Sequence, residues 1–154
     1  MGFSNDVNLA YFGIRNGINK KVDLPFQDTQ LFLGQDASLA FELKCSVNFS
    51  ESFQQRLKSD DWYLYLTIFS ADSNLKVPIY LDQVYGKIPH TIGNISFGAA
   101  FTVNVDGKFV SNNHIRSVKI ELAVTNKTDQ DPGFNSAIKD NCFLQTVVPV
   151  LGMK

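Results

Sequence analysis

Hydrophobic and polar residues alternate along three long stretches of the chain. Odd positions from Leu39 to Phe49 are all apolar, and the positions between them are mostly polar or small. The same alternation runs from Ile95 to Val105, and it returns on the even positions of 118–124. Successive side chains of a β-strand point to opposite faces, so each stretch predicts a strand with one buried and one solvated face. Such strands are typical of antiparallel sheets.

Three further segments have the composition of strands without the clean alternation. The segment 61–70 is apolar or aromatic on both faces, which predicts a central strand or one covered on both sides. The segments 77–85 and 143–151 are rich in β-branched and aromatic residues, and each contains one proline, Pro78 or Pro149. Because proline cannot donate to a sheet ladder, it favours an edge strand or a strand end in both segments.

Turn-forming residues mark the connections between these strands. Asn16-Gly17 and Asp106-Gly107 both fit the central positions of a type I′ hairpin turn. The second hairpin would join the strand before it to a short strand just after it. The stretch 129–141 is rich in Asp, Asn, Pro and Gly, so it is predicted to be a long loop.

One short helix is predicted near residues 51–59. Ser52 and Gln55 have the spacing of a capping box, in which each side chain bonds the backbone N–H of the other residue. Phe53 and Leu57 lie four residues apart and would share one face of the helix. This helix would connect two strands.

The length of 154 residues is that of one domain, and we expect a single domain over residues 1–154. About eight to ten short strands with one short helix predict an all-β fold, an antiparallel β-sandwich. Greek-key, jelly-roll and immunoglobulin-like connections remain open. Cys45 and Trp62 on successive strands favour the immunoglobulin-like arrangement, whereas Cys142 lies too near the C-terminus to be its usual second cysteine.

The two cysteines leave two alternatives. Cys45 and Cys142 lie far apart and match no metal-binding or redox spacing. They could both be reduced and pack as small hydrophobic residues. They could instead form a disulfide between an early strand and the last one, which would imply an oxidising compartment.

Charge is nearly balanced, with 14 Lys and Arg against 15 Asp and Glu and a net charge of −1. This balance removes the electrostatic basis for a general nucleic-acid binder or a polybasic membrane anchor. The N-terminus lacks the pattern of a signal peptide, and no apolar run is long enough to span a membrane. We therefore expect a soluble protein that is cytoplasmic or released with an assembly, with no transmembrane segment.

No residue pattern predicts catalysis. The sequence has no nucleophile elbow with the required glycine spacing and no phosphate-binding loop. His90 and His114 are predicted to lie in loops, without the spacing of a transition-metal site. We therefore expect a protein that is not an enzyme, has no catalytic residue and uses no metal or cofactor.

Two groups of residues are candidates for binding. Tyr63, Tyr65 and Tyr80 could form an aromatic platform for a sugar or a protein, although a strand covered on both sides would bury such residues. Asp129 and Asp131 have the spacing of the first acids of a calcium-binding loop, although Asp and Pro-Gly also build ordinary turns.

These features favour a non-catalytic structural or protein-interaction subunit. It would self-associate or belong to a larger assembly, of a viral, phage or secretion-related kind, and its partner would be a protein or a second copy rather than nucleic acid. The aromatic-rich composition and the apolar ends of the chain support this hypothesis. The alternative is a ligand-binding β-sandwich module for a glycan or a calcium-dependent lipid surface.

Overall fold

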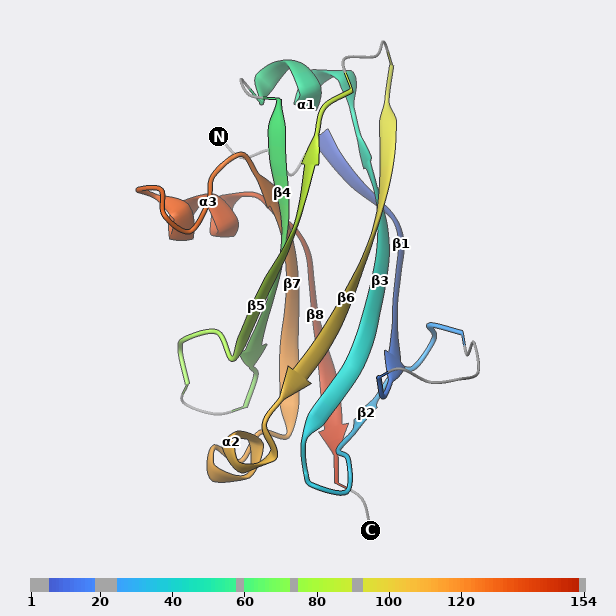
Figure 1. Cartoon of the computed structure of the whole chain (residues 1–154), viewed down its shortest axis with the longest axis vertical. Coiled ribbons are helices and arrows are strands. Elements are labelled where there is room, and N and C mark those ends of the chain that lie inside the picture. The colour runs from blue at the N-terminus through green and yellow to red at the C-terminus, as the bar shows by residue number, and fades with distance from the viewer. Residues whose placement is uncertain (1–5, 19–24, 58–59, 73–74, 90–92, 153–154) are drawn as a thin grey trace.

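The computed structural model describes residues 6–18, 25–57, 60–72, 75–89 and 93–152. Within them the chain forms eight strands and three short helices (Figure 1). In chain order these are β1 (Val7–Asn16), β2 (Leu31–Phe32), β3 (Leu39–Phe49), α1 (Glu51–Arg56), β4 (Asp61–Ser70), β5 (Tyr80–Lys87), β6 (Ile95–Val105), α2 (Gly107–Asn112), β7 (Ser117–Thr125), α3 (Phe134–Asp140) and β8 (Cys142–Leu151). The protein is mostly β, as predicted.

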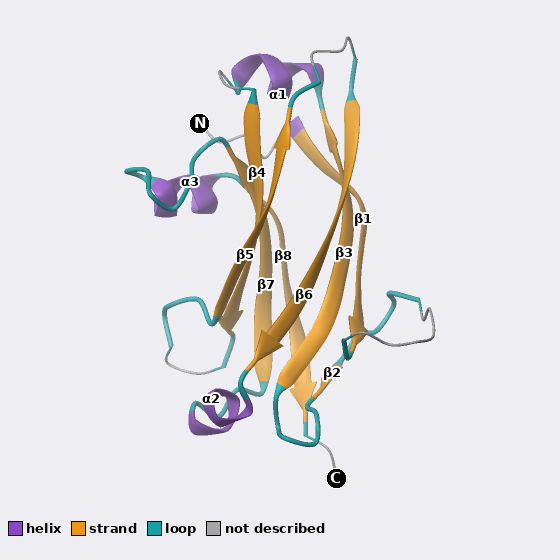
Figure 2. Ribbon diagram, viewed as in Figure 1, coloured by secondary structure: helices purple, strands orange, loops and turns teal. Residues whose placement is uncertain are grey.

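The strands form two sheets, with the short helices at the ends or on the outside (Figure 2). One sheet has the order β1-β3-β6 and is antiparallel; the other has the order β2-β8-β7-β4-β5. β2 runs parallel to β8, so the five-stranded sheet is mixed and the expectation of a purely antiparallel fold is wrong at this edge. The reason is that β2 enters from the other sheet rather than through a hairpin, so no tight turn fixes its direction.

The alternation seen in the sequence places one shared core between the sheets. The odd residues of β3 and β6 and the even residues of β7 are its buried or half-buried positions. They join the inward side chains of β4 in a single hydrophobic cluster. Inside it the ring of Trp62 lies 5.1 Å from that of Phe49 and 4.7 Å from that of Phe97, centroid to centroid. Such aromatic contacts add to the stabilisation from burial alone.

The two cysteines are both free, which answers the question of a disulfide for this structure. Cys45 points into the core from β3, as its strand parity predicts, and is 2% exposed. Cys142 begins β8 and packs instead against a second, smaller cluster that includes Tyr65 and Ile138. The two residues therefore lie on opposite sides of the five-stranded sheet.

β4 is a central strand, which is one of the two alternatives predicted for residues 61–70. It lies between β7 and β5. Its inward residues reach the core, and on the outer face Tyr65 and Thr67 are also buried. The first of the two segments with a proline forms β5, an edge strand as expected, although it begins at Tyr80, beyond Pro78. β8, which contains Pro149, has only the two-residue β2 on its far side.

The helix predicted near 51–59 is present as α1, with a different cap. Ser50 rather than Ser52 is its N-cap, and the Ser50 hydroxyl accepts the backbone N–H of Phe53 at 3.1 Å. Phe53 and Leu57 are buried on the same side, as their spacing predicted. The type I′ turn predicted at Asn16-Gly17 is wrong: Gly17 has a positive φ of 81°, but Asn16 is the last residue of β1 and lacks the positive φ that this turn also requires. Residues 19–24, which follow, lie outside the described part of the chain.

Two loop predictions are wrong because turn residues also cap helices. Asp106-Gly107 does not form a hairpin: the Asp106 carboxylate accepts the N–H groups of Lys108 and Phe109, at 3.0 and 3.2 Å, and starts α2. The loop predicted at 129–141 contains α3 in its second half. Asp and Gly are as favourable at helix ends as in turns, so composition alone did not separate the two outcomes.

Candidate functional site

The outer face of the five-stranded sheet gathers most of the residues with potential for binding. Strand register places Thr67 of β4 directly beside Leu81 of β5 and beside Glu121 of β7, and Glu121 beside Gln145 of β8. One row of side chains therefore crosses the outer face of the sheet, from the exposed apolar Leu81 at the β5 edge to the polar Gln145 on β8. The neighbouring row contains Tyr65 and is covered by α3.

Tyr65 lies under α3 and is not part of the surface. Its ring meets Phe134 of α3 edge-on at 4.9 Å, and only 2% of the residue is exposed. Its hydroxyl donates to the backbone carbonyl of Lys127 at 3.1 Å. Burial, followed by the nearby charges of Asp129 and Asp131, raises the pKa of Tyr65 to about 12. The phenol therefore stays neutral and anchors the loop that leads to α3.

The structure brings Asp129 and Asp131 close to Tyr65, as that electrostatic effect shows. The Asp131 carboxylate, however, accepts both the backbone N–H of Thr128, at 2.7 Å, and its hydroxyl, at 3.2 Å. This pattern is that of an acid that shapes its own turn. Among the described residues, no three His, Cys, Asp or Glu side chains are grouped closely enough to hold a metal ion.

Tyr80 lies apart from the other two candidate tyrosines, on the inward side of β5. Its hydroxyl donates to the backbone carbonyl of Thr102 on β6 at 2.8 Å and contacts the Asp82 carboxylate at 3.3 Å. Burial and the charge of Asp82 raise the pKa of Tyr80. Tyr80 thus links the facing edges of the two sheets.

Tyr63 is the candidate tyrosine that remains at the surface, and Tyr85 lies beside it. Their rings lie 5.4 Å apart on the outer face. The Tyr85 hydroxyl donates to Asp61 at 2.5 Å, and Lys87 pairs with the same carboxylate at 3.5 Å. The hydrogen bond from Tyr85 lowers the pKa of Asp61, and the same bond raises the pKa of Tyr85. Tyr85 was not among the predicted site residues, although its odd position in the segment 77–85 puts it on the opposite face from Tyr80.

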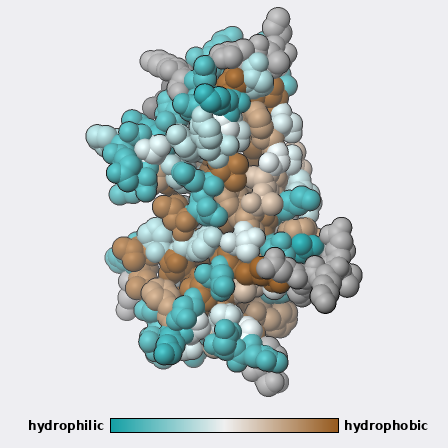
Figure 3. All heavy atoms as spheres, viewed as in Figure 1, coloured by the Kyte–Doolittle hydropathy of each residue, from teal (hydrophilic) through white to brown (hydrophobic). Residues whose placement is uncertain are grey.

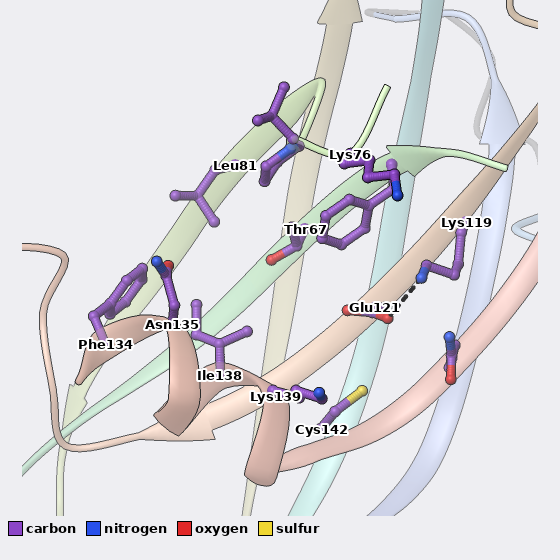
Figure 4. A pocket seen from close by; sticks show the side chains of 14 residues that line it. Thr67, Lys76, Leu81, Lys119, Glu121, Phe134, Asn135, Ile138, Lys139 and Cys142 are labelled. Atoms are coloured by element: carbon purple, nitrogen blue, oxygen red, sulfur yellow. Dashed lines mark ion pairs between the residues drawn. The ribbon is translucent and has the colours of Figure 1, made fainter. Parts of the chain in front are cut away.

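A pocket of about 720 Å³ opens on the same face, between α3 and the segment that precedes β5 (Figure 4). Its floor includes Thr67 and Glu121, and α3 contributes Phe134 and Ile138 to one wall. Glu121 pairs with Lys119 at 3.4 Å, drawn as the dashed line in Figure 4. The volume is within the usual range for small-molecule sites.

Thr67 is the unusual member of this pocket. It is 3% exposed, and its hydroxyl has no hydrogen-bond partner among the described residues. Most buried polar groups in proteins are paired, so this hydroxyl calls for a partner from outside the chain. Sequence reasoning did not select Thr67, although the parity of β4 already placed it on the same face as Tyr65.

Cys142 also lines the pocket, but its thiol is poorly suited to covalent chemistry. Burial and the nearby charge of Glu121 raise the pKa of Cys142. The thiol donates instead to the backbone carbonyl of Leu144 at 3.1 Å. Because the thiolate is the reactive form, a raised pKa makes this cysteine a weak nucleophile.

These features are not assigned by likeness to other proteins. No family model, curated protein or solved structure matches this chain. None of the described helices is long and apolar enough to cross a membrane.

Proposed function

We propose that the chain is a non-catalytic interaction domain that self-associates through the free edge of β6. β6 is the end strand of the three-stranded sheet and pairs with β3 alone. It runs for eleven residues without a register shift, and Ile95 to Val105 contain no charged residue and no proline. A long, regular, uncharged edge is what natural proteins avoid unless another strand pairs with it.

The backbone of β6 offers a regular row of hydrogen-bonding groups along this edge. The carbonyl of Thr102 accepts the Tyr80 hydroxyl from the side away from β3. In an antiparallel strand, residues of the same parity direct their N–H and C=O groups to the same side. The groups of Ser96, Gly98 and Ala100 therefore point to the free edge as well. Figure 3 shows apolar atoms exposed on the face of the molecule where β5 and β6 lie in front.

The other sheet edges carry features that oppose such pairing. On β5 the Asp82 carboxylate accepts the N–H of Gln83 at 2.8 Å, which occupies an edge donor. β1 has a register shift after Leu9, and Asp28 bonds the carbonyl of Ile14 at 3.0 Å. β2 is only two residues long. Charges, bulges and short strands are the known devices against edge pairing, and β6 has none of these three. The Tyr80 hydroxyl occupies the Thr102 carbonyl in the second half of β6, so we propose that a partner strand pairs with the first half, at Ser96, Gly98 and Ala100.

The finer fold assignment supports the same proposal. We propose an immunoglobulin-like sandwich, in which β1, β3 and β6 correspond to strands A, B and E, and β8, β7, β4 and β5 to G, F, C and C′. The buried Trp62 lies on the strand equivalent to C. In that fold a strand D normally covers the edge of strand E. No described strand occupies that position, which leaves β6 as the end of its sheet.

A second copy of the chain fits this edge. Two β6 strands related by a two-fold axis pair antiparallel and join two three-stranded sheets into one of six strands. The outward residues of β6 in its first half are small (Ser96, Gly98 and Ala100), so two copies could approach without steric or charge repulsion. Association of this kind also suits a subunit of a larger assembly.

The test compares the oligomeric state of the chain with that of an edge variant. We expect light scattering after size-exclusion chromatography to give twice the mass of one chain at high concentration. Ala100→Lys should weaken the dimer by about tenfold or more, because two like charges would then face each other near the axis. Asn8→Lys, on the exposed face of β1, is the matched control and should dimerise normally. A wild-type chain that stays monomeric at every concentration, or an equal effect of both variants, would refute the proposal.

Glycan binding is a second candidate, and the pair formed by half-buried Tyr63 and exposed Tyr85 is the observation that favours it. Aromatic faces beside a carboxylate, here Asp61, offer both stacking and a hydrogen-bond acceptor to a sugar. Tyr85→Ala should abolish binding on a glycan array if this surface binds sugar. A wild-type protein that binds no glycan on the array would remove this candidate.

A further inference from the structure

The pocket on the outer face of the five-stranded sheet is separate from the β6 edge, which belongs to the other sheet. It contains a buried hydroxyl without a partner, an excess of positive charge and apolar walls. Each of these features restricts the chemistry of a molecule that could fill it.

The hydroxyl of Thr67 marks the polar end of a ligand. It lies in the floor between two neighbours in the strand register, Leu81 and Glu121, and Figure 4 shows it among the lining side chains. The hydroxyl is buried and has no hydrogen-bond partner among the described residues. A hydroxyl can donate one hydrogen bond and accept others, so a ligand oxygen placed above it would satisfy it.

The charges around the pocket favour an anion. Three lysines line it, Lys76, Lys119 and Lys139, against the single acid Glu121, which gives the lining a net charge of +2. Lys119 pairs with Glu121 at 3.4 Å and also lies over the ring of Phe69 at 4.8 Å. Lys76 and Lys139 form no ion pair within the described residues. Their charges are available to a ligand after Lys119 has neutralised the acid.

The walls favour an aliphatic body attached to that anion. Phe69, Leu81, Phe134 and Ile138 line the pocket, and Val77 stands at its side. Val77 and Leu81 are 62% and 42% exposed, so apolar surface remains open to solvent beside the lysines. Burial of this surface by a hydrocarbon chain would be favourable.

We propose that this pocket binds an aliphatic carboxylate, an acyl chain that ends in a carboxylate group. The chain lies against Leu81 and Ile138. One carboxylate oxygen accepts the hydrogen bond of Thr67, and Lys76 and Lys139 balance its negative charge. Binding involves no covalent step, and it is independent of dimerisation through β6.

The test uses octanoate as the probe and 1-octanol as its neutral counterpart, both titrated into the full chain and followed by backbone amide chemical shifts. We expect octanoate to give saturable shifts at residues of β4, β7 and α3, and to bind about tenfold more tightly than 1-octanol. Equal affinity for the two probes, or no saturable shift with octanoate, would overturn the proposal.

Variants separate the proposed contacts from general effects on the fold. Thr67→Val keeps the shape of the side chain and should weaken octanoate binding by about fivefold without lowering the melting temperature, because the lost hydroxyl had no partner in the free protein. The double variant Lys76→Gln/Lys139→Gln should weaken it by about tenfold. Lys44→Gln/Lys108→Gln is the matched control, since both of its lysines are exposed and outside the pocket. If the control pair weakens binding as much as the pocket pair, the assignment of charge to this site is wrong.

Discussion

Gly86 on β5 tests how tightly the core is packed around the single tryptophan of the chain. A Cβ atom at position 86 would fall less than 3.0 Å from three ring atoms of Trp62, namely Cζ2, Cε2 and Nε1. The ring cannot move away easily, because Trp62 is 2% exposed and is held by Phe49 and Phe97, with centroids at 5.1 and 4.7 Å. Gly86→Ala therefore forces the strand or the ring to shift.

The expected magnitude follows from two opposing terms. Overpacking of a close-packed core costs typically about 1–3 kcal/mol, and the contact with three ring atoms puts Gly86→Ala in the upper part of that range. Alanine restricts the unfolded chain and returns about 0.5 kcal/mol. The net loss in the free energy of unfolding is then about 2 kcal/mol, and the melting temperature should fall by about 4–8 °C.

Gly98 on β6 is the matched control. A Cβ atom there would meet only the carbonyl oxygen of Cys45, at an ordinary 3.9 Å. Gly98→Ala should therefore be neutral or stabilise the fold by about 0.5 kcal/mol. Urea denaturation at low protein concentration, followed by the fluorescence of Trp62, gives both values. If the two variants unfold at the same urea concentration, the packing of Trp62 against β5 described above is wrong.

Two further predictions concern the thiols and the cap of α2. Burial raises the pKa of Cys45 to about 11 from an ordinary 9.0, so the folded state retains this proton where the unfolded state loses it. The contribution of this protonated thiol to the free energy of unfolding is thus complete below pH 9 and is lost as the pH rises through about 11. Urea denaturation midpoints measured over this pH range should therefore fall. A midpoint that does not fall would contradict the burial of the thiol. Asp106→Ala removes the N-cap of α2 and should cost about 1 kcal/mol, whereas Asp106→Asn should cost less, because the amide oxygen still accepts the N–H groups of Lys108 and Phe109. If both variants lose the same free energy of unfolding in a urea titration, the two hydrogen bonds of the Asp106 carboxylate do not stabilise α2 as a cap.

Much of the fold could be predicted because period-two alternation is a local signal. The three clean stretches became β3, β6 and β7 with the predicted faces buried, since a strand with one apolar face has only one favourable register towards a core. The parallel β2 could not be predicted. It is two residues long, and its direction depends on the path of the chain between the sheets rather than on its own residues.

The helices show where local signals conflict. Asp106-Gly107 satisfies both a hairpin turn and a helix N-cap. In the structure Gly107 lies so close to the segment before β3 that a Cβ atom there would clash with the backbone of Asp36 and Ala37, a long-range contact that the local sequence does not show. α3 is similarly hidden, because the two residues that pack it on the outer face of the sheet, Phe134 and Ile138, stand among residues typical of loops. A helix of seven residues gains its stability from the surface that it covers rather than from its own propensity.

The outer face of β4 shows how the same local pattern leads to different roles. The sequence indicated that this strand is central or covered on both sides. In the structure α3 packs on Tyr65, whereas Thr67 lines the pocket beside the helix. Two successive outer-face residues of β4 therefore have different roles. Tyr65 packs against an aromatic ring of α3, and Thr67 lies in the pocket floor with a hydroxyl that has no hydrogen-bond partner among the described residues. Sequence reasoning chose the tyrosines because large aromatic residues stand out in composition. The residue whose hydroxyl lacks a hydrogen-bond partner among the described residues is a threonine, and this is visible only once the neighbouring strands and α3 are in place.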